Sequence, residues 1–311
     1  MNQAEFHRLR GLGFSILAAE YPRFGGKPGE PTEQTVEQEA QVAYDYLRKN
    51  NNVSERNIVI YGLSLGTGVA VDLASRVTAG ALVLIAPFTS VGDLGHLLYP
   101  YIPVSLLVSD RFESDTKIGA AHLPVFVFHT VEDEYHPFEE ARRLYELAGN
   151  PKHFEEAHGP HAEHSYPFFL ALQQFLSAST GLKVHAPRKW ISSVLEVTTE
   201  AKGLQAGLQE YQELRARHSD EYNFAEYELS HLGRDLLSKG KSTDAIAILK
   251  LNAEEYPESF NVYDELGDAY LQAGDKQAAE QNFRRSLQVY PGADNYSRKK
   301  LDALLTATKS Q

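Results

Sequence analysis

The amino-acid sequence predicts an α/β domain, with a parallel sheet covered by helices on both faces, followed by an all-α domain of helical repeats. Over roughly the first 180 residues, short apolar runs alternate with amphipathic helical patterns, which is typical of such a sheet. From Tyr222 onward the strand signals vanish and a 34-residue helical period appears. We therefore expect a first domain over residues 1–180, a linker over 181–198 and a helical domain over 199–311.

Composition excludes several functional classes. The chain has 311 residues, of which 42% are hydrophobic, enough for two packed domains. Its net charge of −12 argues against nucleic-acid binding, and the absence of cysteine excludes disulfides, thiolate metal ligands and cysteine nucleophiles. No apolar run approaches the ~20 residues of a membrane span, and the residues after Met1 do not resemble a signal peptide.

Four segments of the first domain are predicted to be buried strands because they are short, apolar and rich in β-branched or aromatic residues. They are Phe14–Ala19, Ile58–Tyr61, Ala81–Ala86 and Pro124–His129. A helix is expected between the first two of them, where Thr35 and Gln38 match a capping box. Helices are also expected after Ile58–Tyr61 and after Pro124–His129.

The second predicted strand runs into Gly62-Leu-Ser-Leu-Gly66, which is the G-x-S-x-G pattern of a nucleophile elbow. A serine on so tight a turn has a strained backbone, so we expect that neither Gly62 nor Gly66 can carry a Cβ. Helical spacing follows directly. The backbone amide of Leu65 is therefore expected at a helix N-terminus, where a developing oxyanion is favoured.

A serine hydroxyl needs a base to act as a nucleophile, and the base needs an orienting carboxylate. Asp133 follows a predicted strand, at the end where open α/β sheets bind ligands. His161 comes later, so Ser64, Asp133 and His161 have the nucleophile, acid, base order of α/β-hydrolases. His164 is the second candidate base. A metal cluster of His158, His161 and His164 is disfavoured because no carboxylate pattern accompanies it, and no metal or other cofactor is expected.

Further motifs surround these residues. They are Glu20-Tyr-Pro-Arg-Phe-Gly-Gly26, Ala86-Pro-Phe-Thr-Ser90, Asp110-Arg-Phe-Glu-Ser114 and His129-Thr-Val-Glu-Asp-Glu-Tyr-His-Pro137. With the elbow, they make residues 10–177 resemble small serine hydrolases of the α/β-hydrolase superfamily, the group of membrane-anchored protein depalmitoylases and their bacterial relatives. The resemblance implies Ser64 as nucleophile, Asp133 as orienting acid and His161 as base. It does not specify a substrate.

The chain departs from this family pattern at several positions. Thr130 replaces a glycine, His136 replaces an apolar residue, and His158-Gly-Pro-His161 stands in place of G-x-G-H. Glu132 and Glu134, on either side of the candidate acid, are expected to be solvated loop charges.

In the family, three strands and an HG-x-x-G loop precede the position at which Met1 stands here. That loop supplies the first oxyanion donor, and loss of such a donor typically lowers the rate ~100- to 1,000-fold. The resemblance therefore predicts an incomplete sheet, and it suggests an internal start, a fragment or a decayed copy. Localisation stays open: cytoplasmic for the chain as given, exported or membrane-anchored if a segment precedes it.

The helical period of the C-terminal domain matches at corresponding positions 34 residues apart. The pairs are Leu232-Gly233 with Leu266-Gly267, Gly240 with Gly274, Ala245 with Ala279, Leu249 with Phe283, and Tyr256-Pro257 with Tyr290-Pro291. The pattern resembles tetratricopeptide repeats, at about 226–259 and 260–293. A helix over 203–217 is expected to pack on one end, and a helix over 295–307 to cap the other.

Two functions follow from these observations. The first is a serine hydrolase that cleaves an acyl ester or thioester, with an amide as a less favoured substrate. The alternative is a non-catalytic interaction protein, in which the repeats bind a protein or peptide partner and the truncated hydrolase half is inert. The order of Ser64, Asp133 and His161 favours the enzyme, and the missing first oxyanion loop favours the alternative.

Overall fold

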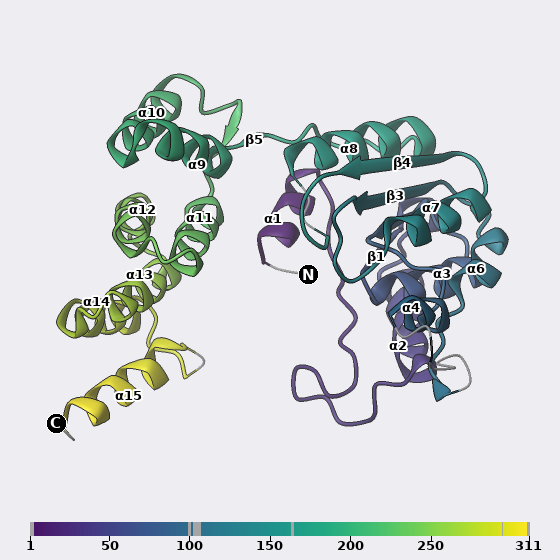
Figure 1. Cartoon of the computed structure of the whole chain (residues 1–311), viewed down its shortest axis with the longest axis horizontal. Coiled ribbons are helices and arrows are strands. Elements are labelled where there is room, and N and C mark those ends of the chain that lie inside the picture. The colour runs from purple at the N-terminus through teal and green to yellow at the C-terminus, as the bar shows by residue number, and fades with distance from the viewer. Residues whose placement is uncertain (1–2, 99–100, 102–106, 163–164, 294, 310–311) are drawn as a thin grey trace. The chain divides into compact units, whose positions relative to one another are not determined.

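The computed structural model describes residues 3–98, 101, 107–162, 165–293 and 295–309 (Figure 1). The chain divides into two compact units. Unit 1 includes Arg8–Pro187, and unit 2 consists of Asn2–His7 and Arg188–Gln311. The boundary falls inside the segment 181–198 that was predicted to be a linker.

Unit 1 alternates strands and helices as the sequence predicts. After the N-terminal helix α1 (Gln3–Gly11), its elements are α2 (Glu33–Asp45), β1 (Val59–Leu63), α3 (Gly66–Arg76), β2 (Ala81–Ile85), α4 (Val91–Leu98), α6 (Ser114–Lys117), β3 (Val125–Thr130), α7 (Phe138–Leu147), β4 (Lys152–Ala157) and α8 (Tyr166–Thr180), with short single-turn helices between some of them. The four strands form one parallel sheet in the order β1-β2-β3-β4. The α/β class with a parallel sheet is thus confirmed.

Helices cover both faces of this sheet. Successive strand residues point to opposite sides, and β2 and β3 carry apolar side chains on both sides that are buried by this covering. On one face, Leu84 and Val127 belong to a buried core that also contains residues of α2, α3 and α7. On the other face, the ring of Phe168 from α8 packs on Phe126 and Phe128 at centroid distances of 5.9 and 4.9 Å. Figure 1 shows α8 along β4, on the side away from α7. All strands end at one edge of the sheet, where the loops of the candidate site lie.

The prediction of a strand at Phe14–Ala19 is wrong. The segment has no regular structure, and Leu17 is 46% exposed. Among the described residues, β1 is an edge strand of the sheet and does not pair with this segment. An apolar run becomes a strand only where its amide and carbonyl groups find a neighbouring strand. Apolar composition alone is therefore insufficient to make this segment a strand.

Strand β4 was missed, and the cap of α2 was misplaced. Lys-His-Phe-Glu-Glu-Ala, the sequence of β4, has few apolar residues because β4 is the other edge strand of the described sheet. The N-cap of α2 is Thr32, whose side chain accepts from the Thr35 amide at 3.3 Å. The Oγ1 of Thr35 in turn accepts from the Thr32 amide at 2.9 Å. This capping box has threonine where the usual pattern has glutamate or glutamine, so the usual pattern does not indicate it.

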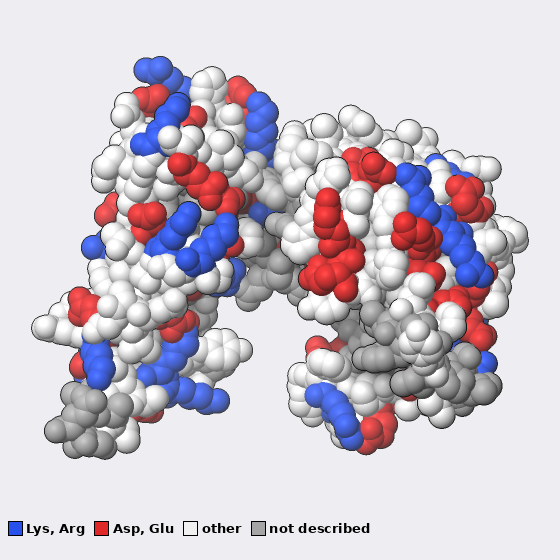
Figure 2. Space-filling view, viewed as in Figure 1, with Lys and Arg blue, Asp and Glu red and all other residues white. Residues whose placement is uncertain are grey.

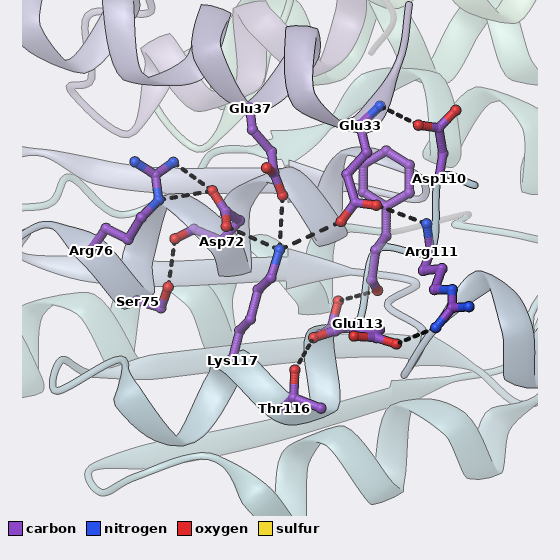
Figure 3. A network of polar contacts seen from close by, with 12 residues as sticks. Glu33, Glu37, Asp72, Ser75, Arg76, Asp110, Arg111, Glu113, Thr116 and Lys117 are labelled. Atoms are coloured by element: carbon purple, nitrogen blue, oxygen red, sulfur yellow. Dashed lines mark hydrogen bonds and ion pairs between the residues drawn. The ribbon is translucent and has the colours of Figure 1, made fainter. Parts of the chain in front are cut away.

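A network of ion pairs ties helix α6 to α2 and α3 (Figure 3). The Lys117 ammonium lies 2.8 Å from a Glu37 oxygen, 3.0 Å from Asp72 and 3.5 Å from Glu33. Asp72 is buried, and burial alone would raise its pKa, but hydrogen bonds from Arg76 and Lys117 outweigh this effect and lower that pKa. Burial raises the pKa of Glu37 despite its bond to Lys117. Lys117 therefore neutralises carboxylates that would otherwise repel one another.

Replacing Lys117 by Met is expected to lower the free energy of unfolding of unit 1 by about 1–3 kcal/mol at pH 7, because it leaves Asp72 and Glu37 without their shared cation. A lowered pKa in the folded state stabilises the fold above the unfolded-state pKa of about 4, and this contribution is lost as the pH falls through the folded-state value. The difference between variant and wild type should therefore persist from pH 7 down to about 4 and narrow only as the pH falls below that value.

Urea unfolding followed by circular dichroism at several pH values measures this difference. Lys49→Met is the matched control, because Lys49 pairs with Asp45 at an exposed site where a salt bridge contributes about 0–1 kcal/mol. Equal losses in both variants, or a loss that does not depend on pH, would contradict the role given to Lys117.

Unit 2 is largely helical. Its elements are β5 (Lys189–Trp190), α9 (Ile191–Lys202), α10 (Leu204–Arg217), β6 (Tyr222–Asn223), α11 (Glu226–Ser238), α12 (Ser242–Glu255), α13 (Phe260–Gln272), α14 (Lys276–Val289) and α15 (Ser297–Lys309). The short strands β5 and β6 pair with each other. The C-terminal half of the expected linker is helix α9, whose Ile191 and Leu195 are fully buried in the core of this unit. Those residues are therefore part of the fold.

Two helix pairs of unit 2 share one packing feature. A Cβ on Gly233 of α11 would lie 2.5 Å from the side chain of Leu249 on α12. A Cβ on Gly267 of α13 would likewise lie 2.4 Å from Phe283 on α14. Both glycines and both partners are separated by 34 residues, so the same close helix approach recurs at the period seen in the sequence.

Charged side chains of both signs are interspersed over the face shown in Figure 2. Acidic residues exceed basic ones, 42 to 30, in the whole chain. No helix in the described part of the chain is both long and apolar enough to cross a bilayer.

Candidate active site

Ser64 occupies the turn between β1 and α3, at the carboxyl edge of the sheet. Its φ angle is +52°, in the left-handed region that residues with a side chain rarely adopt. The turn is held from both sides. The Ser64 amide donates to the Ile85 carbonyl at 2.9 Å, and Thr67 donates to the Ser64 carbonyl through both its amide, at 2.9 Å, and its hydroxyl, at 2.6 Å. These bonds fix the strained backbone that presents the Ser64 hydroxyl.

The two glycines of the motif differ in how much free space there is for a Cβ atom. A Cβ on Gly62 would lie 2.7 Å from the Gly66 carbonyl oxygen and 2.8 Å from the Ala70 Cβ, so Gly62 cannot carry a side chain without displacing α3. A Cβ on Gly66 would have the Tyr21 hydroxyl as its nearest neighbour, at 4.0 Å. The expectation that both positions exclude a Cβ is correct for Gly62 and wrong for Gly66, because only the first faces the helix that follows.

The structure brings Ser64, Asp133 and His161 together. The Nε2 atom of His161 lies 2.9 Å from the Ser64 Oγ, and its Nδ1 atom lies 2.7 Å from the Asp133 Oδ2. The residues come from three loops, which follow β1, β3 and β4. The Asp133 side chain is fully buried, and the His161 side chain is 17% exposed.

The surroundings of Asp133 favour its ionised form. Its Oδ1 accepts hydrogen bonds from the amides of Tyr135 at 2.9 Å and His136 at 2.8 Å. Burial alone would raise the pKa of Asp133, but these two bonds and the bond from His161 lower it. Because a carboxylate only accepts, His161 must donate through Nδ1, which leaves the lone pair of Nε2 directed at the Ser64 hydroxyl. The arrangement can therefore remove the hydroxyl proton.

The amide of Leu65 lies at the N-terminus of α3, next to Ser64. It donates no hydrogen bond to any other described residue. The Leu65 residue is 52% exposed. An amide in this position can bind an oxygen that becomes negatively charged next to Ser64.

Two further histidines lie around the candidate triad. His136 donates through Nδ1 to the Ala86 carbonyl at 2.8 Å, and the edge of its ring packs on His161 with a centroid distance of 4.9 Å. His129 is fully buried, with its Nε2 3.7 Å from the Asp133 Oδ2. Burial lowers the pKa of both side chains, which favours their neutral forms. Sequence reasoning had noted His136 only as a departure from the family pattern.

The remaining sequence candidates are resolved in different ways. His164 lies outside the described residues. His158 does not reach Ser64, since its Nδ1 donates to Glu132 at 2.7 Å. In the residues that the structure describes, no group of three or more histidine, aspartate or glutamate side chains is placed to hold a metal ion.

Glu132 and Glu134 are not simply solvated charges, as the sequence had suggested. Glu132 accepts from His158 and from the Gly159 amide, and Glu134 accepts from the His161 amide at 3.0 Å. The missed signal was the unbroken acidic run around Asp133, which faces a loop with two histidines. Pairing between two loops distant in sequence cannot be read from either loop alone.

The amino-acid sequence was compared with family models and with known proteins, and part of it is similar to several proteins. No family model matches the chain. It is 35% identical over 181 residues to an uncharacterised protein of Mycobacterium tuberculosis, covering 56% of this chain and 64% of that protein. It is 28% identical over 162 residues to lysophosphatidylserine lipase ABHD12 of Danio rerio, and this match covers 46% of this chain and 42% of that protein. It is 31% identical over 140 residues to human alpha/beta hydrolase domain-containing protein 17B, and this match covers 45% of this chain and 47% of that protein.

A solved structure with partial similarity is an esterase of Pyrococcus furiosus. It has a TM-score of 0.47 and 19% sequence identity, and the match covers 57% of this chain and 74% of that chain. The present chain spans between 42% and 64% of the length of these curated relatives. The named relatives support the α/β-hydrolase superfamily as the family of the matched part of this chain.

Proposed function

We propose that this protein is a serine hydrolase that cleaves an ester or thioester through an acyl-enzyme. The observation that carries the proposal is the continuous hydrogen-bonded chain from the Ser64 Oγ through His161 to Asp133, with separations of 2.9 and 2.7 Å. These distances are within the range required between a nucleophile, its base and the orienting acid.

In the proposed reaction, His161 Nε2 removes the hydroxyl proton as the Ser64 Oγ attacks the substrate carbonyl carbon. The carbonyl oxygen takes the negative charge and accepts a hydrogen bond from the Leu65 amide. The intermediate then collapses, the bond to the leaving group breaks, and His161 returns the proton to that group. Water attacks the acyl–Ser64 ester with His161 again as base, which releases the acid and restores the hydroxyl. Asp133 keeps Nδ1 protonated and stabilises the imidazolium.

An acyl substrate is favoured by the residues around Ser64 and by the named relatives. The side chain of Leu65 is exposed beside the nucleophile, and the exposed ring of Tyr135 packs edge-on against His161 at 5.2 Å. Apolar surface next to a nucleophile suits an acyl group more than a charged one. One relative is named a lysophosphatidylserine lipase.

For unit 2 we propose tetratricopeptide-type repeats that bind a protein or peptide. Support comes from the recurrence of the Gly233–Leu249 contact as Gly267–Phe283, 34 residues later. The C-terminal helix α15 packs next to α14, in the position of a capping helix.

A second candidate is a non-catalytic interaction protein. It is favoured by one observation: within the described residues, no strand pairs with the outer edge of β1. A strand at the edge of a sheet is paired with a neighbouring strand on one side only, so it is held less firmly than a strand paired on both sides.

A fluorophosphonate probe distinguishes the two candidates. The folded 311-residue chain is expected to react at Ser64, located by mass spectrometry of the labelled peptide, and Ser64→Ala is expected not to react. Ser75→Ala is the control, because the Ser75 hydroxyl donates to the Asp72 carbonyl on α3, away from the triad. If the folded wild type stays unlabelled, or if labelling persists in Ser64→Ala, the hydrolase proposal is wrong and the interaction protein is favoured.

A further inference from the structure

The loop that presents His161 is held by the loop that presents Asp133. The three consecutive acids Glu132, Asp133 and Glu134 each accept a hydrogen bond from residues 158–161. Asp133 accepts from the imidazole of His161, and Glu134 accepts from the backbone amide of the same residue. Glu132 accepts from the imidazole of His158 and from the Gly159 amide.

Glu134 acts on the same residue as Asp133. Its Oε2 accepts from the His161 backbone amide at 3.0 Å, while the Asp133 Oδ2 lies 2.7 Å from the His161 Nδ1. His161 is therefore held at both its main chain and its ring by adjacent residues of one loop. Two such points restrict the χ1 and χ2 rotation that would carry Nε2 away from Ser64.

Glu132 holds the start of the same loop. One carboxylate oxygen accepts from His158 Nδ1 at 2.7 Å, and the other accepts from the Gly159 amide at 2.9 Å. The hydrogen bond to Glu132 raises the pKa of His158, and the same bond lowers the pKa of Glu132. Both side chains are exposed, so this contact is weaker than a buried one.

Two further hydrogen bonds attach the histidine loop to the segment before Asp133, and one of them joins Thr130 and Pro160, which both depart from the family pattern. The buried Thr130 hydroxyl donates to the Pro160 carbonyl at 3.0 Å, and the Val131 amide donates to the Ala157 carbonyl at 2.9 Å. The loop itself has Gly159 at φ +130° and Ala162 at φ +56°, so its own backbone is not held by regular structure. Its shape depends on the acidic loop.

We propose that Glu134 is a positioning residue for His161 and that Glu132 supports it from the start of the histidine loop. The inference deepens the proposed hydrolase and rests on it. Neither glutamate contacts Ser64 or the position of the substrate carbonyl. Each acts through the backbone of the loop that presents the imidazole.

The kinetic test uses p-nitrophenyl acetate hydrolysis and the fluorophosphonate labelling rate. Glu134→Ala should lower kcat on the order of tenfold with little change in KM, because small misplacements of reacting groups have effects of this size or larger. Glu134→Gln should recover most of the activity, since its amide oxygen can still accept from the His161 amide. Glu132→Ala should lose less activity than Glu134→Ala, because its bonds lie two to three residues from the base.

Two controls separate positioning from a general structural effect. Glu139→Ala removes an equal exposed charge at the first turn of α7 and should leave kcat unchanged. The end-point fraction of labelled protein should stay the same in Glu134→Ala while the labelling rate falls. A merely structural role would lower the labelled fraction instead.

A second readout does not depend on activity. The His161 Nδ1 proton, deshielded by its bond to Asp133, should give a downfield proton resonance that is lost in Asp133→Asn. That resonance should broaden in Glu134→Ala and stay sharp in Glu134→Gln and Glu139→Ala. Wild-type kcat and a sharp resonance in Glu134→Ala would overturn the positioning role and leave the hydrolase standing. A wild type without Ser64-dependent labelling would overturn the hydrolase, whereas resonance broadening would still report the loop contact.

Discussion

Ser64→Ala, His161→Ala and the double variant are all expected to lower kcat by a similar factor, on the order of 10⁶, because Ser64 and His161 act as one unit with Asp133. Once Ser64 has no hydroxyl, His161 has no proton to remove. Once His161 is gone, the hydroxyl stays a weak nucleophile. The second substitution therefore removes nothing that the first has left in place.

Hydrolysis of p-nitrophenyl acetate by each single variant and by the double variant measures this dependence. Residual activity above the rate in water would come from the Leu65 amide and from substrate binding, which do not need the triad. Losses that multiply in the double variant would show that Ser64 and His161 act separately, contrary to the 2.9 Å contact between them. Ser75→Ala should retain wild-type activity.

Asp133→Asn is expected to lower kcat by about 10⁴-fold, because it reverses the tautomer of His161. The Oδ1 of Asp133 already accepts from the amides of Tyr135 and His136, so an asparagine would place its oxygen there. Its amide group would then face the His161 Nδ1, where two donors would oppose each other. The imidazole would protonate Nε2 instead, and that atom could not accept the Ser64 proton.

Asp45→Asn is the matched control for Asp133→Asn, because both substitutions remove one carboxylate charge. The kcat of the two variants is compared. Asp45 lies on the exposed end of α2, where it pairs with Lys49, and its replacement should leave kcat unchanged. Circular dichroism confirms that each variant is folded. A loss below about tenfold in Asp133→Asn would mean that His161 does not depend on this carboxylate for its tautomer.

Much of the sheet could be predicted because burial leaves a local pattern. Strands β1, β2 and β3 coincide closely with the apolar, β-branched runs, since strands covered on both faces need side chains that suit a dry interior. Phe14–Ala19 has the same kind of composition but no strand partner, so the pattern misled there. Strand β4 has a partner but only a mixed composition. Edge pairing is decided by the neighbouring strand and not by the segment itself.

The residues of the candidate site could be named from the sequence because their chemistry and order are local properties. Ser64 stands in a G-x-S-x-G turn after a strand, and Asp133 and His161 follow in a recognisable order. What the sequence could not supply is the spatial pairing of the acidic and histidine loops. The contacts of Glu132 and Glu134 join residues 27 positions apart, Glu132 with Gly159 and Glu134 with His161.

The sequence by itself determined the α/β class, the strained turn at Ser64 and the 34-residue period of the C-terminal helices, because each depends on spacing within one segment. Only the tertiary structure decided which segments join the sheet, and which donors meet the carboxylates of Glu132, Asp133 and Glu134. The physical reason is that a hydrogen bond needs two partners within about 3 Å, and folding rather than sequence order sets that distance.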